Sequence, residues 1–202
     1  QYQPELLFPC ILLLHLQLLK MMNQNNTRGF RQKALICALC GVVFYVLMLT
    51  VTLAHLESMT GHVPFDMRPT GYDAKDAAEL LSALGDSGRR YYLTRQVPLD
   101  MVYPALLGLT LVFTLQWLGR GYISAGLLRV GGIVAISAAA CDYAENTGIV
   151  VMILNWPTLS HHLVTATSIA SVLKAVLTTF AVLFVLFAAG WRLRPHSAEF
   201  DT

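Results

Sequence analysis

Four stretches of the chain are long, apolar and nearly free of charge. Residues 34–54 and 101–119 contain no Asp, Glu, Lys or Arg, whereas residues 130–154 contain two acidic residues and residues 164–190 contain a single lysine. Each stretch approaches the roughly 20 residues that a helix needs to cross the hydrocarbon core of a bilayer. Because lipid offers the backbone no hydrogen-bond partner, each stretch should be helical.

We therefore predict an all-α integral membrane protein whose residues 34–194 form a transmembrane four-helix bundle. The transmembrane helices are expected near residues 34–56, 99–119, 129–154 and 164–190, and residues 195–202 form a C-terminal tail.

Residues 57–98 join the first two spans and should form an amphipathic helical cap on the extracytoplasmic end of the bundle. Asp73 is placed to cap a helix at its N-terminus, with Asp76 three residues later. An apolar face then repeats at helical spacing, and its members are Ala77, Leu80, Leu81 and Leu84. Gly85 should end this helix.

The rest of the cap leads into the second span. A second short helix is expected from Ser87 to Gln96, and Pro98 suits the first turn of the following transmembrane helix. Three tyrosines of the cap are expected to anchor it at the membrane interface, where tyrosine is favoured: Tyr72, Tyr91 and Tyr92.

The N-terminal segment, residues 1–33, contains an apolar run at 6–19 that is short for a span and is interrupted by Pro9. It lacks the basic start and small-residue cleavage site of a signal peptide. Two interpretations stay open: an interfacial helix, or sequence upstream of a natural start at Met21 or Met22. The second is favoured because a polar run follows these methionines.

The composition agrees with a membrane protein. Of 202 residues, 13% are charged and 55% are hydrophobic, whereas about 25% of residues are charged in soluble domains. Lys and Arg number 14 and Asp and Glu number 12, which leaves a net charge of +2. These values exclude a disordered chain, a disulfide-rich scaffold and a nucleic-acid-binding domain, so we expect no nucleic-acid partner.

Basic residues beside the spans predict the orientation. They fall in three regions that should share one side of the membrane: Arg28, Arg31 and Lys33; Arg120 and Arg129; and Arg192 and Arg194. Residues 155–163, between the last two spans, contain no Lys or Arg. By the positive-inside rule both termini are cytoplasmic and residues 57–98 are extracytoplasmic. The basic residues inside that loop count less because they lie farther from the membrane ends.

Ionisable residues inside the spans are the most informative feature. Asp142, Glu145 and Asn146 lie at i, i+3 and i+4 and therefore share one face of the third helix. A carboxylate at membrane depth costs about 3 kcal/mol and needs a partner or a proton. Lys174 on the fourth helix should lie at the same depth, roughly 14 Å below the outer surface, and can pair with either carboxylate.

This group has two interpretations of about equal weight. It is a structural ion pair that fixes the register of two helices, or a ligand-binding site, which the excess of carboxylates slightly favours. Asp100 and Tyr103 on the second span complete the candidate ligand-binding residues. For Asp100 alone, interaction with the N-terminal dipole of the second helix is the favoured role.

Other chemistry has little support in the sequence. His161 and His162 are adjacent and point in different directions on a helix, so no metal site is expected. The chain lacks a phosphate-binding loop, a dinucleotide fingerprint and a nucleophile elbow, so no cofactor is predicted. Whether the protein is an enzyme stays open.

Several short motifs carry a family resemblance. They are Phe65-Asp66-Met67-Arg68 with Gly71-Tyr72, Ala78–Gly85 with Arg89 and Tyr92, Asp100 with Tyr103-Pro104, Asp142 with Glu145-Asn146, and Leu173-Lys174. From about Lys33 to Trp191 the chain resembles a family of small four-span bacterial inner-membrane proteins of unassigned function. The resemblance implies this fold, a recurring polar cluster and an inner-membrane location, but no substrate.

The sequence leaves three functional hypotheses. The first is a membrane protein that binds a lipid or a small polar molecule in the outer half of the bundle. The second is a non-catalytic subunit or assembly factor with a structural ion pair, whose partners would be other membrane subunits. The third and weakest is a small transporter that acts as an oligomer, because four spans without an internal repeat make alternating access hard.

Overall fold

The computed structural model describes the backbone of residues 7–194 and the side chains of residues 27–194. Within this part the regular elements are all helices. The predicted tail at 195–202 lies outside the described residues.

The helices follow one another with short connections. In chain order they are α1 (Leu7–Leu47), η2 (Met48–Leu53), α2 (Ala54–Thr60), η3 (Phe65–Met67), α3 (Ala74–Tyr91), η4 (Tyr92–Gln96), α4 (Val97–Asp100), α5 (Tyr103–Gly119), α6 (Ala125–Leu154) and α7 (His161–Arg192). The segments η2 and η4 are π-helical, and η3 is a single 3-10 turn.

Four helical segments are long and apolar enough to cross a membrane, which supports the predicted multi-pass membrane protein. They are Thr27–Thr60, Ala74–Gly119, Ala125–Leu154 and His161–Arg192. The second is longer than predicted. Pro98 lies in the first turn of α4, as expected, but this turn does not begin the span. The chain is already helical before Pro98, through η4, and bends at Gly85 and at Met101–Val102 instead.

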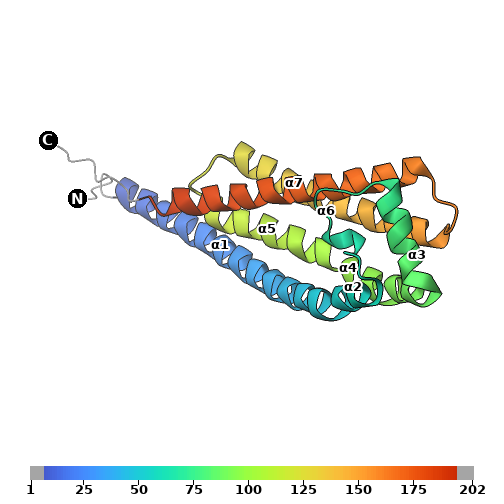
Figure 1. Cartoon of the computed structure of the whole chain (residues 1–202). Coiled ribbons are helices and arrows are strands. Elements are labelled where there is room, and N and C mark those ends of the chain that lie inside the picture. Colours follow the sequence, from blue (N-terminus) through green and yellow to red (C-terminus); the bar gives the residue numbers. More distant parts are fainter. Residues whose placement is uncertain (1–6, 195–202) are drawn as a thin grey trace, which may run out of the picture.

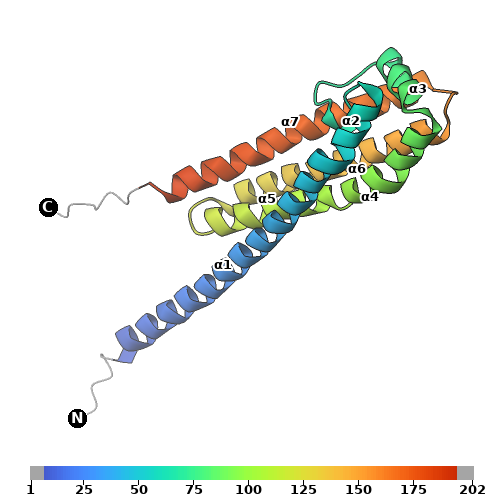
Figure 2. The same ribbon diagram turned by 60° about the horizontal axis from the view of Figure 1, so that its bottom comes forward.

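The long helices form an elongated bundle in which α5, α6 and α7 pack against one another and α1 packs along α5 (Figures 1 and 2). Small residues allow close approach. A side chain at Gly108 would meet Ala139 on α6, and one at Gly148 would overlap Thr167 on α7. This agrees with the small-residue packing that is common between membrane helices.

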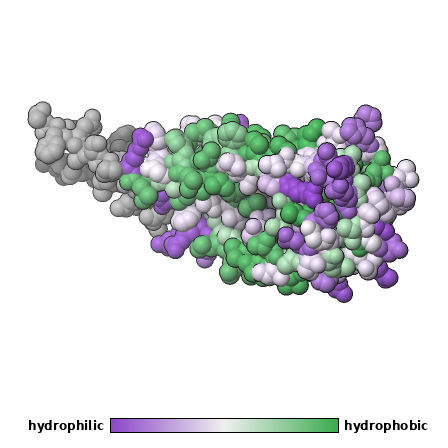
Figure 3. All heavy atoms as spheres, viewed as in Figure 1, coloured by the Kyte–Doolittle hydropathy of each residue, from purple (hydrophilic) through white to green (hydrophobic). Residues whose placement is uncertain are grey.

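The outer surface of the bundle is apolar. Figure 3 shows a broad hydrophobic band between two more hydrophilic ends. On α1, Leu39 and Ile36 are 68% and 64% exposed, which a soluble protein would avoid in a continuous surface of this kind. The band fits a bilayer as its solvent.

The polar connection between the first two spans folds across one end of the bundle, where α3 crosses the long helices (Figure 1). The Asp73 side chain accepts a hydrogen bond from the backbone of Asp76, whose own side chain accepts from the backbone of Asp73. This capping box and the break at Gly85, where φ is +57°, occur where the sequence predicted the ends of a helix. The predicted apolar face of α3 is buried, as expected.

The three basic regions meet at the opposite end of the bundle. The guanidinium groups of Arg31 and Arg192 both lie 5.8 Å from the centre of the Trp117 ring. That of Arg120 lies 5.2 Å from the Phe30 ring. The regions that the sequence assigned to one side of the membrane are therefore together in space.

Candidate functional site

The ion pair expected between α6 and α7 is present and buried. The Lys174 ammonium contacts a carboxylate oxygen of Glu145 and lies 3.0 Å from Oδ1 of Asp142. The side chains of Glu145 and Asp142 are 0% and 10% exposed. Ser171, one turn before Lys174, donates a 2.5 Å hydrogen bond to Oε1 of Glu145. The helical spacing on α6 thus presents two carboxylates to a single lysine.

Asn146 lies beside this ion pair and reaches a different helix. Its Nδ2 donates to the backbone carbonyl of Asp100 at 3.1 Å. Four residues after Asp100 the chain has Pro104, which carries no N–H and therefore cannot make the usual helical bond to that carbonyl. The side chain of Asn146 takes the place of the missing donor at the break between α4 and α5.

Asp100 itself is buried and belongs to a second acidic group. It is the last residue of α4, three residues before α5 begins, and it is 3% exposed. Its carboxyl group lies within hydrogen-bonding reach of that of Asp66 in η3. The hydroxyl of Tyr92 donates to the other oxygen of Asp66, Oδ2. Two carboxylates this close repel each other, and a shared proton or a cation between them relieves the repulsion.

Two tyrosines that were expected at the membrane interface are inside the protein. Tyr92 and Tyr72 are 0% and 8% exposed, and both rings pack against Phe65. Tyr92 donates to Asp66 through its hydroxyl, whereas the contact of Tyr72 is made by its backbone N–H, which donates to Ser168 Oγ at 2.8 Å. Tyr91 is half-buried against His55.

The phenol of Tyr72 lies close to the ion pair. Burial, reinforced by the negative charge of Glu145, raises the pKa of Tyr72 above its ordinary value. The hydroxyl therefore stays protonated at neutral pH and can act as a hydrogen-bond donor.

The two π-helical segments meet beside this region. Thr52 of η2 donates a hydrogen bond to Oε1 of Gln96 of η4, and both side chains are buried. π-Helical turns inside α-helices are rare and are frequent at functional sites. Here they bring a polar residue of the first span into contact with the second.

Tyr103 is placed differently from the other predicted site residues. Its ring stacks on Tyr45 of α1 at a centroid distance of 5.6 Å. Both tyrosines line a cavity of about 160 Å³ between α1 and α5. Within the described residues Tyr103 makes no hydrogen bond to the carboxylates.

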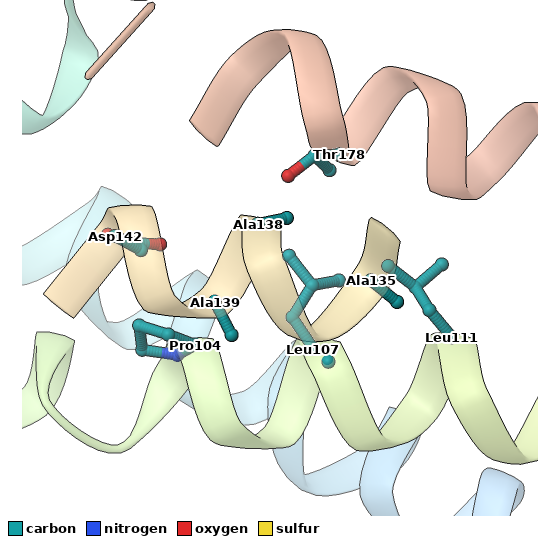
Figure 4. A pocket seen from close by; sticks show the side chains of 9 residues that line it. Pro104, Leu107, Leu111, Ala135, Ala138, Ala139, Asp142 and Thr178 are labelled. Carbon is teal, nitrogen blue, oxygen red and sulfur yellow. The ribbon is translucent and has the colours of Figure 1, made fainter. Parts of the chain in front are cut away.

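A small cavity of about 10 Å³ adjoins Asp142 between α5, α6 and α7 (Figure 4). Its walls are mostly apolar, with Pro104 and Leu107 on α5 and Thr178 on α7. This is about the space that one water molecule needs. Asp142 stands at one end of the row of labelled side chains and is the acidic residue that lines the cavity.

Together these residues form what we call the acidic cluster: Asp66, Asp100, Asp142, Glu145, Asn146 and Lys174. It holds four carboxyl groups and one ammonium group. Three buried acceptor atoms of the cluster find no hydrogen-bond donor among the described residues: Asp66 Oδ1, Asp100 Oδ2 and Asn146 Oδ1. Burying an unpaired polar atom costs free energy, so the cluster is short of donors.

The described residues contain no group of three or more His, Cys, Asp or Glu side chains arranged to hold a metal ion. Added donors to the cluster are therefore best sought among protons, water, amines and hydroxyl groups, which satisfy carboxylates through hydrogen bonds.

Sequence reasoning did not assign Asp66 or Tyr92 to the site. The two are 26 residues apart in the polar connection, and no periodic pattern links such a pair to the spans. Asp66 was part of the motif Phe65-Asp66-Met67-Arg68 that carried the family resemblance, and this was the available signal.

Comparison with protein-family models, with curated proteins and with solved structures finds no match to this chain. The function therefore has to be inferred from the residues themselves.

Proposed function

We propose that this protein is a multi-pass protein of the bacterial inner membrane that binds a small polar molecule or lipid headgroup at the acidic cluster. The bound group would donate hydrogen bonds, and a primary ammonium group fits best. The proposal is supported mainly by one observation: two buried carboxyl oxygens, Asp66 Oδ1 and Asp100 Oδ2, receive no hydrogen bond from the described residues.

The charge balance favours a cationic donor. Lys174 is fully engaged by Asp142 and Glu145, so it leaves the pair of Asp66 and Asp100 without a cation. An ammonium group between those two carboxyl groups would neutralise them and supply the donors that they lack.

The proposed orientation has both termini in the cytoplasm and residues 57–98 outside. The gathering of the three basic regions at one end of the bundle supports it, because basic residues at membrane ends favour the cytoplasmic side. The acidic cluster would then lie in the outer half of the membrane, beneath the cap.

A second candidate function is that of a non-catalytic membrane subunit whose acidic cluster is structural. The small volume of the cavity beside Asp142 and the double pairing of Lys174 favour this alternative. Both observations concern the Lys174 side of the cluster. For Asp66 and Asp100 the two candidate functions differ in the partner: a shared proton in the structural cluster, or an ammonium group in the binding site.

Lipid binding in nanodiscs tests the proposal. The wild-type protein is reconstituted into bilayers of phosphatidylcholine with a minor fraction of phosphatidylethanolamine, and lipids retained after transfer to detergent are counted by native mass spectrometry. The two headgroups carry the same net charge, but only ethanolamine has N–H donors. We expect preferential retention of the ethanolamine lipid, and its loss in the double variant Asp66→Asn/Asp100→Asn.

The matched control is Glu57→Gln, which removes an exposed carboxylate near the same end of the bundle. It should retain the ethanolamine lipid as the wild type does. If the wild type shows no preference, the same experiment is repeated with free ethanolamine and choline as thermal-shift probes. Equal shifts with both compounds would contradict an amine-binding site.

A further inference from the structure

A third cavity lies at the basic end of the bundle, far from the acidic cluster along the long axis. It has a volume of about 390 Å³ and is formed where α5 ends and α6 begins. Its polar wall contains Gln116, Arg120 and Arg129, and its apolar wall contains Ile123 and Leu128. Figure 1 shows the turn between α5 and α6 at the same end as the C-terminal end of α7.

The two arginines of this cavity have no acidic partner. Within residues 27–194, neither Arg120 nor Arg129 forms an ion pair. All Asp and Glu residues in this part of the chain lie in the segment 57–100 or at positions 142 and 145 on α6. The cavity therefore has two positive charges that no described carboxylate balances.

The neighbouring arginines are already engaged. Arg192 donates a 2.8 Å hydrogen bond to the backbone carbonyl of Trp117, and its guanidinium lies 5.5 Å from the Tyr122 ring. The Arg31 guanidinium also lies 5.8 Å from the centre of the Trp117 ring. These contacts hold the ends of α1, α5 and α7 together. Arg120, which lies 5.2 Å from the Phe30 ring, and Arg129 line the cavity.

The position of the cavity at the membrane surface favours a lipid as its ligand. It is at the ends of two membrane-spanning helices, beside Trp117 and Tyr122, and such aromatic residues are typical of the headgroup level of a bilayer. Ile123 and Leu128 give the cavity the apolar surface that the first carbons of an acyl chain require, and Arg120 and Arg129 line it as well. A paired guanidinium wall suits the oxygens of a phosphate group.

We propose that this cavity binds the phosphate group of an anionic phospholipid, with Arg120 and Arg129 as its cationic ligands. The site does not depend on the amine-binding function proposed for the acidic cluster, because it lies at the opposite end and recognises the opposite charge. Basic pockets between membrane helices are suited to such headgroups.

The test compares phosphatidylglycerol with phosphatidylcholine in mixed nanodiscs that contain the full-length protein. Lipids that stay bound are counted by native mass spectrometry for the wild type and for Arg120→Gln/Arg129→Gln. We expect a preference for phosphatidylglycerol in the wild type that falls about 30-fold in the double variant, as two basic contacts imply. Arg90→Gln, which removes an exposed arginine at the other end, should leave the preference unchanged.

Three results would overturn the proposal. The first is an undiminished preference in Arg120→Gln/Arg129→Gln, which would assign it to the remaining basic residues. The second is an equal loss in Arg90→Gln. The third is a thermal shift with inorganic phosphate in lipid-free micelles while phosphatidylglycerol gives no preference in nanodiscs, which would identify a site for free phosphate.

A single substitution keeps the test valid if the double variant does not fold. Arg129 is exposed on the first turns of α6, so Arg129→Gln should fold as the wild type does. It should lower the preference about fivefold, the effect of one basic contact. An unchanged preference in this folded variant would remove Arg129 from the site and contradict the proposal.

Discussion

The side-chain amide of Asn146 hydrogen-bonds to the backbone carbonyl of Asp100, with 3.1 Å between Nδ2 and the oxygen. The contact joins the middle of α6 to the break between α4 and α5. Pro104 has no N–H and cannot donate to this carbonyl. The side chain of Asn146 on α6 therefore supplies the hydrogen bond that the backbone of α5 lacks. This relationship has a consequence that can be measured as a coupling between two substitutions.

Asn146→Leu should destabilise the protein by about 1–3 kcal/mol, because it leaves a buried carbonyl without a donor. Pro104→Ala restores a backbone N–H at the position from which the helix normally supplies one. The double variant should therefore lose less stability than the sum of the single variants. Reversible unfolding in mixed micelles measures the free energies of unfolding of the two single variants and the double variant. If the two single losses simply add up in the double variant, the Asn146 hydrogen bond does not contribute to stability.

Lys174→Met should destabilise the bundle by about 3–5 kcal/mol, because it leaves Asp142 and Glu145 as uncompensated buried charges. The triple variant Lys174→Met/Asp142→Asn/Glu145→Gln removes these charges together and should recover most of the loss. The measurement is the same unfolding free energy. Lys75→Met, at an exposed position on α3, is the control and should stay within about 0.5 kcal/mol of the wild type.

The variant Asp66→Asn/Asp100→Asn separates the two proposed functions, because it removes the two carboxylates between which the amine would bind. If the acidic cluster is structural, the folded variant behaves as the wild type in every assay of binding. If the cluster is a site, the variant folds but loses its preference for the ethanolamine lipid. A triple variant as unstable as Lys174→Met alone would contradict the charge-compensation argument itself.

The features that the sequence predicted are those that depend on local spacing. Asp142 and Glu145 share a helical face because they are three residues apart, and the short link to α7 brings Lys174 to their level. The capping box at Asp73 and the break at Gly85 are equally local. Each of these follows from helix geometry without knowledge of the rest of the chain.

The features that it missed depend on how distant segments close over one another. Asp66 reaches Asp100 through the path of the chain around Pro64 and Gly71, and no pattern along the sequence encodes that path. Tyr92 was expected at the membrane interface because tyrosine favours such positions. Its burial against Asp66 shows that a specific partner outweighs this general preference. The π-helical turns η2 and η4 were not predicted either, because a hydrophobic periodicity of 3.6 residues identifies only α-helices.

Tyr92→Phe should loosen the cap by removing the hydrogen bond to Asp66. We expect a loss of about 1–3 kcal/mol, because Asp66 is then short of a further donor. Hydrogen exchange of the backbone in residues 61–73 should become faster. Tyr91→Phe is the matched control, since Tyr91 is half-buried and contacts His55 through its ring. Equal exchange rates in both variants would contradict a role for the Tyr92 hydroxyl in holding the cap.

Gly148→Ala should separate α6 from α7, because a methyl group at this position would overlap the Thr167 side chain. The expected loss is about 1–3 kcal/mol. Gly132→Ala on the same helix is the control, since a methyl group there meets nothing within 4 Å. Combining Gly148→Ala with Thr167→Gly removes every side-chain atom that the added methyl group would overlap, so the double variant should lose less stability than Gly148→Ala alone. If Gly148→Ala and Gly132→Ala unfold alike, the α6–α7 contact is not close at this level.

The orientation can be tested by labelling single cysteines in intact bacteria. In a variant whose native cysteines are replaced by serine or alanine, Ser124→Cys places a thiol in the α5–α6 turn at the basic end, and Asp86→Cys places one on the exposed side of the cap. The proposed topology makes Asp86→Cys react with a membrane-impermeant maleimide in whole cells, whereas Ser124→Cys reacts after lysis. The reverse labelling pattern would show that the protein has the opposite orientation, with the acidic cluster in the cytoplasmic half of the membrane. Both side chains are exposed, so each thiol is accessible to the reagent from its own side, and the difference in labelling reports the side of the membrane directly.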